Sequence, residues 1–325
     1  MEAYFDGIKK NEPGMQPVYQ VLNYPMMESP IYTKYPYMEA AGPTPPSYGL
    51  RYDYRKPAEL INYFESPDFI EDAKLYKRWA EKGFWSKSAL SVGTPADALA
   101  TGKAAARMDG QNAVKYATLV AQVKKSHPEW ELGYIPFVYT NKLVHPVHPV
   151  HNGFAIPRSA KNADRALMFY QKLVLDKRYN FLTQYGIPGK HYKVTADNKY
   201  EMIGTTSSNG FPREAMNGWA WRNPSFQLFD SSYETAFALF KEYDSLATPN
   251  IRDGFAEEIV PYQAEAAAFN QVFTQYGLPI YYGMAGDPET AVKRFLEKAR
   301  QAGWDKIVSE YRKQWLAYCK EQGLD

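Results

Sequence analysis

Apolar side chains recur at intervals of three or four along several segments of this chain, and capping residues mark the segment ends. Ser66 and Pro67 open one such segment, which Gly83 ends. A second begins at Asp287-Pro288 and ends at Gly303, and its apolar positions form one stripe. The same periodicity predicts further helices at 111–125, 162–174, 232–243, 261–276 and 307–318.

Short apolar runs between these helices predict strands at 104–108, 132–138 and 154–157. A short helix is expected from Thr94-Pro95 to Gly102. The first 55 residues are rich in Pro and Tyr, so we expect loops and short extended pieces there and no start of a core. Residues 179–230 also show little periodicity and are expected to be irregular. The alternation of helices with short strands predicts an α/β protein.

The composition is that of a soluble globular protein long enough for two domains. The chain has 325 residues, of which 45% are hydrophobic and 23% charged. Its formal charge of +2 is too balanced for binding to a phosphate backbone, so nucleic acid is not an expected partner. Uncharged apolar runs such as 119–123 are too short to span a bilayer, and the N-terminus does not resemble a secretion signal.

Aromatic residues make up 16% of the chain, which suits both core packing and the binding of amphipathic ligands such as sugars. The segment 217–223 is the most suggestive aromatic loop, because Trp219 and Trp221 stand beside Arg222 and Asn223. Packing and ligand binding both explain such a loop. Cys319, the single cysteine, is expected to be a buried, inert thiol.

Signatures of common enzymes are missing from the sequence: it contains no P-loop, no Gly-x-Ser-x-Gly elbow, no HExxH pair and no CxxC pair. His145, His148 and His151 recur with a period of three, but extended imidazoles about 9 Å apart do not reach one ion without bending. Glycoside hydrolysis would need two facing carboxyls, and the candidates Asp253, Glu257 and Glu258 are better explained as acids at a helix start. We therefore expect no enzyme activity, no metal and no cofactor.

Seven sequence pieces occur in the order found in one family of transport proteins. They are IKKNEPG (8–14), KRWAEKGFWSKSA (77–89), TGKAAARMDG (101–110), FAIPRSAKNADRALMFYQKL (154–173), YNFLTQYGIPGKHY (179–192), WAWRN (219–223) and KARQAGWDKIVSEYRKQWLAY (298–318). Over nearly its whole length the chain thus resembles the extracellular solute-binding proteins of ABC importers, in a lipoprotein-like group with a DUF3502 C-terminal region.

The resemblance implies two α/β lobes joined by a hinge, a type II periplasmic-binding-protein-like fold with the ligand between the lobes. It assigns 1–132 and 255–325 to the C-terminal lobe, and 133–254 to the remaining part of the N-terminal lobe with the hinge crossings. Family members begin with a lipoprotein signal, a lipidated cysteine and the first elements of the N-terminal lobe. None of these precedes IKKNEPG here, so we expect a truncated N-terminal lobe and weak ligand binding.

The resemblance also implies function, partners and location. The expected function is to bind a small carbohydrate-like solute and deliver it to ABC permease subunits outside the cytoplasm. Membrane association would require a lipid anchor that is absent from this chain. The candidate ligand-binding residues are Trp219, Trp221 and Asn223, with Trp85 and Tyr192 as weaker ones. The alternatives are a non-transport ligand sensor or a non-functional truncated remnant, and, second, a carbohydrate-active enzyme.

Overall fold

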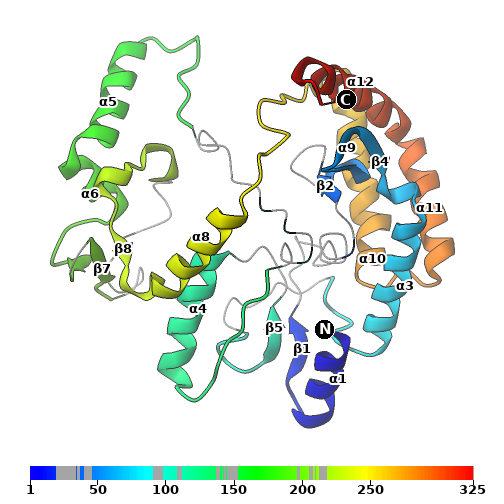
Figure 1. Cartoon of the computed structure of the whole chain (residues 1–325), viewed down its shortest axis with the longest axis horizontal. Helices are drawn as coiled ribbons and strands as arrows, with labels where there is room; N and C mark the ends of the chain where they lie inside the picture. The colour runs from blue at the N-terminus through cyan, green and yellow to red at the C-terminus, as the bar shows by residue number, and fades with distance from the viewer. Residues whose placement is uncertain are drawn as a thin grey trace. The chain divides into compact units, whose positions relative to one another are not determined.

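The computed structural model describes residues 1–19, 34, 37–39, 46–90, 98–107, 112–136, 140, 142, 144, 153–195, 198–204, 208, 210–211 and 218–324. The chain divides into two compact units (Figure 1). Unit 1 comprises 1–112, 122–145 and 246–325, and unit 2 comprises 113–121 and 146–245. These bounds differ from the lobe boundaries expected from the sequence, and the assignment of the units to lobes stays a prediction.

Unit 1 combines two small sheets with a group of helices. In its sheets, β1 (Gln16–Tyr19) pairs in parallel with β5 (Ala104–Arg107), and β3 (Leu50–Asp53) lies between antiparallel β2 (Tyr37–Glu39) and β4 (Lys56–Asn62). Its helices are α1 (Glu2–Asn11), α3 (Pro67–Glu81), α9 (Gln263–Val272), α10 (Leu278–Tyr281), α11 (Pro288–Gln301) and α12 (Trp304–Gln322). The C-terminal helices lie beside α3, which α10 and α11 both contact (Figure 1).

The capping residues identified in the sequence lie at the helix ends, as expected. The Ser66 hydroxyl accepts a hydrogen bond from the Phe69 amide at the start of α3, and Asp287 Oδ1 accepts one from the Thr290 amide, 2.9 Å away, at the start of α11. Gly303 adopts a left-handed φ of 89° between α11 and α12. The predictions for both segments are confirmed.

A single aromatic-rich core holds unit 1 together. Its thirty buried apolar residues come from almost every element of the unit. Three buried indoles also donate long-range hydrogen bonds to backbone carbonyls: Trp85 to Tyr282 (3.1 Å), Trp304 to Tyr48 (2.9 Å) and Trp315 to Pro57 (2.7 Å). Each indole thus adds a directional bond to its burial, which fixes segments far apart in sequence against the C-terminal helices.

The first 55 residues depart from the predicted loops. They contain α1, β1 and β3, and they contribute Phe5, Val18 and Leu50 to the core. Phe5 packs edge-on against Trp79 of α3, with ring centroids 5.9 Å apart. The strands confirm the predicted short extended pieces. The expectation that no core starts here was wrong, because the partners of these short elements lie far along the chain and a local pattern does not reveal them.

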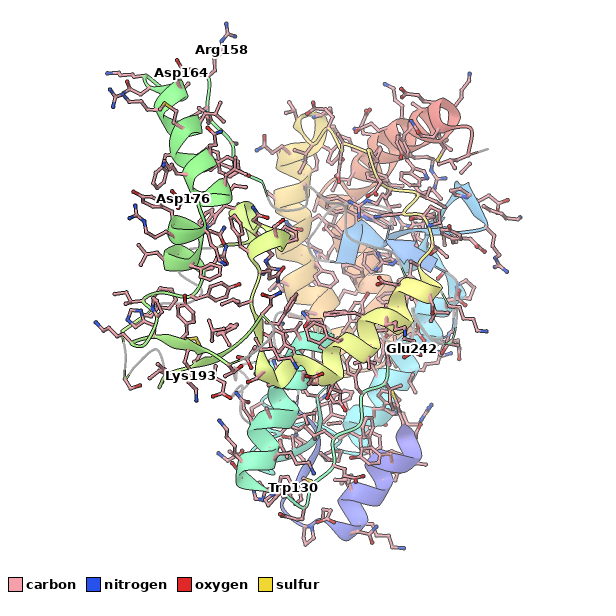
Figure 2. All side chains as sticks on the ribbon, turned by 60° about the vertical axis from the view of Figure 1, so that its left-hand side comes forward. Trp130, Arg158, Asp164, Asp176, Lys193 and Glu242 are labelled. Atoms are coloured by element: carbon pink, nitrogen blue, oxygen red, sulfur yellow. The ribbon has the colours of Figure 1, made fainter. Side chains whose placement is uncertain are left out.

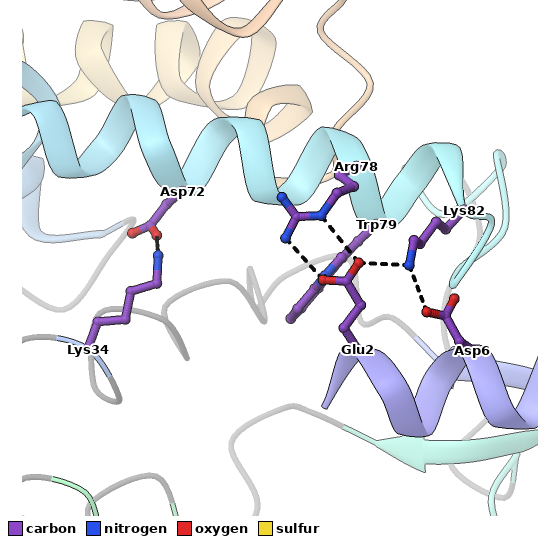
Figure 3. Close-up of polar contacts among 7 residues, drawn as sticks. All are labelled: Glu2, Asp6, Lys34, Asp72, Arg78, Trp79 and Lys82. Atoms are coloured by element: carbon purple, nitrogen blue, oxygen red, sulfur yellow. Dashed lines mark hydrogen bonds and ion pairs between the residues drawn. The ribbon is translucent and has the colours of Figure 1, made fainter.

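Polar contacts also attach α1 to the C-terminal end of α3 (Figure 3). Glu2 accepts hydrogen bonds from Arg78 and from the Trp79 indole, and its carboxylate also pairs with Lys82. Elsewhere on α3, the fully buried Asp72 accepts a hydrogen bond from Tyr63 (2.6 Å) and pairs with Lys34. Burial raises the pKa of Asp72, against the effect of these two partners.

Unit 2 has a smaller core. Its helices are α5 (Ala163–Leu175), α6 (Lys177–Gln184) and α8 (Glu234–Leu246), with the first part of α4 (Ala113–Ser126). In its sheet, β7 (Lys199–Met202) pairs antiparallel with β6 (Tyr192–Val194) and parallel with β8 (Phe229–Asp230). Two clusters of buried apolar residues are present among its described residues: Tyr185, Tyr192, Tyr200 and Leu228; and Ala113, Ala117 and Ala236.

Several predicted elements of the middle of the chain need correction. Residues 132–136 and 154–157 form no strand in the structure, and 137–138 lie outside the described residues. Pro136 and Pro157 have no amide to donate, and Ile135 is 78% exposed. The segment 179–230 is more regular than expected, because it holds most of α6 and the three strands of unit 2. Residues 98–102 are turns, and Thr94-Pro95 lies outside the described residues.

Candidate functional site

The tryptophan loop singled out from the sequence forms two short helical turns in unit 2. A 3-10 turn, η5 (Gly218–Trp221), contains both tryptophans, and Asn223 caps the next turn, η6 (Pro224–Phe226). The backbone of Trp219 is described, whereas its side chain lies outside the described part of the structure. Trp221 and Asn223 are both half-buried.

Helices α5 and α6 fix the η5 backbone by hydrogen bonds from their side chains. The Tyr170 hydroxyl of α5 donates to the Ala220 carbonyl at 2.9 Å. Asn180 Nδ2 of α6 donates to the Trp221 carbonyl at 3.0 Å and to the Leu173 carbonyl at 2.8 Å. Because Asn180 is only 2% exposed, these two bonds satisfy an amide group that burial would otherwise penalise.

The polar groups of Trp221 and Asn223 also bond within the protein. Trp221 Nε1 donates to Thr183 Oγ1 at 3.1 Å. Asn223 Nδ2 donates to the Val174 carbonyl at 2.9 Å, and its Oδ1 accepts from the Ser225 amide at 3.0 Å. Trp221 and Asn223 therefore use their polar atoms to hold the loop, and the positions that these bonds fix directly follow Trp219.

Tyr170, Asn180 and Thr183 were missed by sequence reasoning. Each lies on α5 or α6 and bonds to a loop residue 38 or more positions further along the sequence. Only Asn180 gives a local signal of such a role. Asparagine in the interior of a helix does not favour helix formation, so its presence there points to a specific hydrogen-bond partner.

The two weaker candidates are core residues in this structure. Trp85 is 3% exposed within the unit 1 core, and its indole nitrogen bonds to Tyr282. Tyr192 is 2% exposed on β6 among Tyr185 and Tyr200, and burial raises the pKa of its hydroxyl. Protein atoms cover both rings, so we leave both residues out of the proposed site. They also lie in different units, and neither joins the tryptophan loop in a described contact.

The candidates for other chemistry have local structural partners or fall outside the described residues. Glu257 accepts a hydrogen bond from the Tyr262 hydroxyl at 2.6 Å, Glu258 from the Val260 amide at 3.1 Å, and Asp253 from Asn250 at 3.2 Å. Cys319 is fully buried in α12. His145, His148 and His151 lie outside the described residues. Among the residues that are described, no His, Cys, Asp and Glu cluster could hold a metal ion.

The helices of the described part of the chain include none that is both long and apolar enough to cross a membrane.

Comparisons with known proteins identify the C-terminal region and the fold. Residues 252–320 match the model of the family described as domain of unknown function DUF3502. No curated protein matches the sequence.

Solved structures match almost the whole chain. The N-glycan transport solute binding protein NgtS from Streptococcus pneumoniae matches with a TM-score of 0.71 and 17% identity, over 99% of this chain and 67% of that protein. The same protein in complex with Man5GlcNAc matches with a TM-score of 0.64 and 18% identity, over 98% and 66%. An HMO-binding, ABC-transporter-associated solute binding protein from Bifidobacterium longum infantis matches with a TM-score of 0.56 and 13% identity, over 97% and 68%.

All three structures are of solute-binding proteins, and this chain matches about two thirds of their length. The chain therefore has the α/β fold of the extracytoplasmic solute-binding proteins of ABC importers, and it carries a DUF3502 region at residues 252–320.

Proposed function

We propose that this protein binds a saccharide and delivers it to ABC permease subunits on the outer side of the membrane. The observation that carries the proposal is the tryptophan loop at 218–223, in which side chains of α5 and α6 hold Ala220 and Trp221, directly after Trp219, by hydrogen bonds. Neighbours of the same fold that are named for N-glycan transport and HMO binding support the same solute class.

The physical argument rests on an aromatic side chain carried by a loop whose backbone is held by hydrogen bonds. Tryptophan offers a large apolar face to the CH groups of a sugar ring, and neighbouring polar groups orient the sugar hydroxyls. A loop already held by side chains from two helices loses less conformational entropy when a ligand binds, so more of the contact energy appears as affinity. We assign the platform to Trp219, with Trp221 and Asn223 as its supports and Arg222, which is exposed, as a polar neighbour.

Thermal unfolding with a panel of glycans tests the proposal. A ligand that binds only the folded state stabilises it by RT ln(1 + [L]/Kd), about 2.7 kcal/mol at a hundredfold excess over Kd. We expect Man5GlcNAc or human-milk oligosaccharides, the ligand classes named for two neighbours of the same fold, to raise the melting temperature. Loss of one aromatic platform costs on the order of 1–3 kcal/mol in binding, so Trp219→Ala should weaken affinity about tenfold or more.

Phe240→Ala is the matched control, since Phe240 is a 38% exposed aromatic residue of α8 in the same unit. It should leave the ligand-induced shift unchanged. A cooperative melt that no glycan shifts would overturn the saccharide assignment for the sugars tested. A glycan shift that survives Trp219→Ala would remove the platform role from the loop. Delivery is tested separately, by whether the loaded protein stimulates ATP hydrolysis by the complete ABC transporter in vesicles.

A further inference from the structure

Helix α5 packs on α6 and on the η5 turn through the side that carries the buried Leu173. Another side of the helix is exposed and mixes cations with large apolar groups. We call it the basic face of α5, and it consists of Arg165, Met168, Phe169 and Lys172. At about 100° per residue, these four side chains fall within one sector of about 100°. Exposed Asp164 and Gln171 lie outside this sector, on the neighbouring one.

Contacts at the end of α5 extend the basic face onto α6. The ring of Tyr179 lies close to two cations: Lys172 Nζ is 5.7 Å and the Arg178 guanidinium carbon 5.0 Å from the ring centroid. Asp176, between the two helices, lies 3.5 Å from Lys172 Nζ and offsets part of this charge. The two helices thus present one surface on which cations, an aromatic ring and apolar side chains alternate.

The basic face belongs to a segment with a large excess of positive charge. Residues 153–195 contain eight Lys and Arg and two Asp, an excess of six, whereas the whole chain has a formal charge of +2. All eight cations are exposed, and two of them, Lys172 and Lys193, pair with carboxylates. Figure 2 shows Arg158, above α5, and Lys193, below α6, on the same edge of unit 2. The balanced charge of the whole chain therefore conceals a local basic surface.

The same segment is also rich in exposed apolar side chains. Of the fifteen large hydrophobic residues that are exposed in the described part of the chain, eight lie within 153–195. Met168 and Phe169 of the basic face are 65% and 60% exposed. Positive charge and exposed apolar groups are therefore concentrated in the same 43 residues.

This combination fits the surface of an anionic lipid bilayer. Lys and Arg reach the lipid phosphates, while Met, Phe and Leu side chains enter the boundary between headgroups and acyl chains. A soluble anion would use the charges alone. The exposed side chains of α5 project over several sides of the helix, and a deformable lipid surface covers such a shape more readily than a rigid protein surface does.

We propose that the segment 153–195 is a membrane-contact surface, which binds anionic phospholipid bilayers through the basic face of α5. A binding protein that delivers its solute to a permease works beside a bilayer, and this part of the argument rests on the proposed function. The tryptophan loop bonds to the packed side of α5, so saccharide and bilayer would meet different sides of the helix. The contact is direct, in addition to the lipid anchor expected from the resemblance.

Vesicle flotation with the full chain tests the proposal without any saccharide, so its failure is distinguishable from failure of the proposed function. The probes are vesicles of phosphatidylcholine alone and of phosphatidylcholine with about an equal part of phosphatidylglycerol. We expect binding at least tenfold tighter to the anionic vesicles. Raising the salt from about 0.1 M to about 1 M shortens the Debye length from about 10 Å to about 3 Å and should remove most of this binding.

The double variant Arg165→Glu, Lys172→Glu tests the charges of the basic face. It should weaken binding to the anionic vesicles at least tenfold, since each cation near the surface contributes about fivefold. Its matched control is Lys241→Glu with Lys293→Glu, which makes the same change in net charge at exposed positions of α8 and α11. The control should stay within about twofold to threefold of the wild type.

The double variant Met168→Gln, Phe169→Gln tests the apolar contribution at constant charge. It should weaken binding to the anionic vesicles about fivefold or more, because the two side chains no longer gain from entering the lipid boundary. Circular dichroism of each variant alone checks that it still folds.

Four outcomes would overturn the proposal. The first is equal binding to neutral and anionic vesicles, or binding to neither. The second is an equal loss of binding in the basic-face variant and its charge control. The third is displacement from the vesicles by glycerol 3-phosphate at constant ionic strength, which would make a soluble phosphate the ligand. The fourth is protection of α5 from hydrogen exchange by an acidic protein but not by anionic vesicles, which would make a protein the partner.

Discussion

Glu2, in the first turn of α1, shows how one surface carboxylate can fix a terminal helix. Arg78 Nε and Nη2 lie 3.2 and 3.0 Å from its two oxygens, Lys82 Nζ lies 2.8 Å away, and the Trp79 indole donates at 3.1 Å. The hydrogen bonds from Arg78, followed by those from Lys82 and Trp79, lower the pKa of Glu2 to about 2. The charged form is thus the one that the folded state prefers.

Because the folded-state pKa is depressed, this stabilisation is fully present above the ordinary value of 4.5 and is lost as pH falls toward about 2. The side chain is 29% exposed, so solvent screening limits the gain to about 1 kcal/mol. We expect Glu2→Gln to lower the free energy of unfolding by about that amount at neutral pH and by progressively less below pH 4.5.

Urea denaturation of both proteins across this pH range measures the difference, with Glu297→Gln, a change at an exposed position of α11, as the control. A stability difference between the wild type and Glu2→Gln that is the same at acid and neutral pH would contradict the assignment.

At the residue scale, the sequence showed which residue types could bind a sugar but not which of them are exposed. Tryptophan and tyrosine suit both a core and a sugar site, so Trp85 and Tyr192 were reasonable ligand candidates. In the structure both are at most 3% exposed. Burial depends on neighbours contributed by distant segments, such as Tyr282 for Trp85, and residue type alone does not contain that information.

At the scale of elements, the tryptophan loop depends on α6 through one buried side chain. Asn180 bridges the last turn of α5, at the Leu173 carbonyl, and the η5 turn, at the Trp221 carbonyl. Removal of this amide leaves the Leu173 and Trp221 carbonyls without this donor. It also removes the hydrogen bonds that connect α6 to α5 and to η5.

We expect Asn180→Ala to destabilise the protein by about 2 kcal/mol and to weaken saccharide binding through the loosened loop. Gln171→Ala, at an exposed position of α5, is the control and should change neither quantity. Thermal melts with and without glycan measure both effects. An Asn180→Ala protein of unchanged stability would show that the two bonds contribute nothing net.

Helices were easier to predict than strands for a physical reason. The caps at Ser66 and Asp287 act within three residues, so the sequence alone locates them. The strand β1 is defined by its pairing with β5, almost ninety residues away, and the runs at 132–136 and 154–157 form no strand despite a similar composition. Strand formation therefore depends on partners that local periodicity does not specify.

At the scale of the whole molecule, the two units differ in how much apolar surface they bury. Unit 1 builds its core from both ends of the chain, as when Trp304 and Trp315 bond to Tyr48 and Pro57. Unit 2 relies on two small clusters. Local stability should follow this difference, since regions with few buried apolar contacts open at lower free energy.

We accordingly expect the slowest hydrogen exchange in α3, α11 and α12, and faster exchange in α5, α6 and the strands of unit 2. Mass spectrometry on the isolated chain at neutral pH measures this. Equal protection in the two units would show that they unfold as one cooperative structure and would contradict the expectation.

The sequence by itself determined the α/β class, the boundaries of well-capped helices such as α3 and α11, and the series of motifs that resembles solute-binding proteins. These follow from local periodicity, capping and residue order, which a chain carries without its fold. Only the tertiary structure decided which aromatic residues are buried, that the N-terminal segment joins the core, and that Tyr170, Asn180 and Thr183 hold the tryptophan loop. Each of these depends on contacts between segments distant in sequence, and such contacts exist only once the chain has folded.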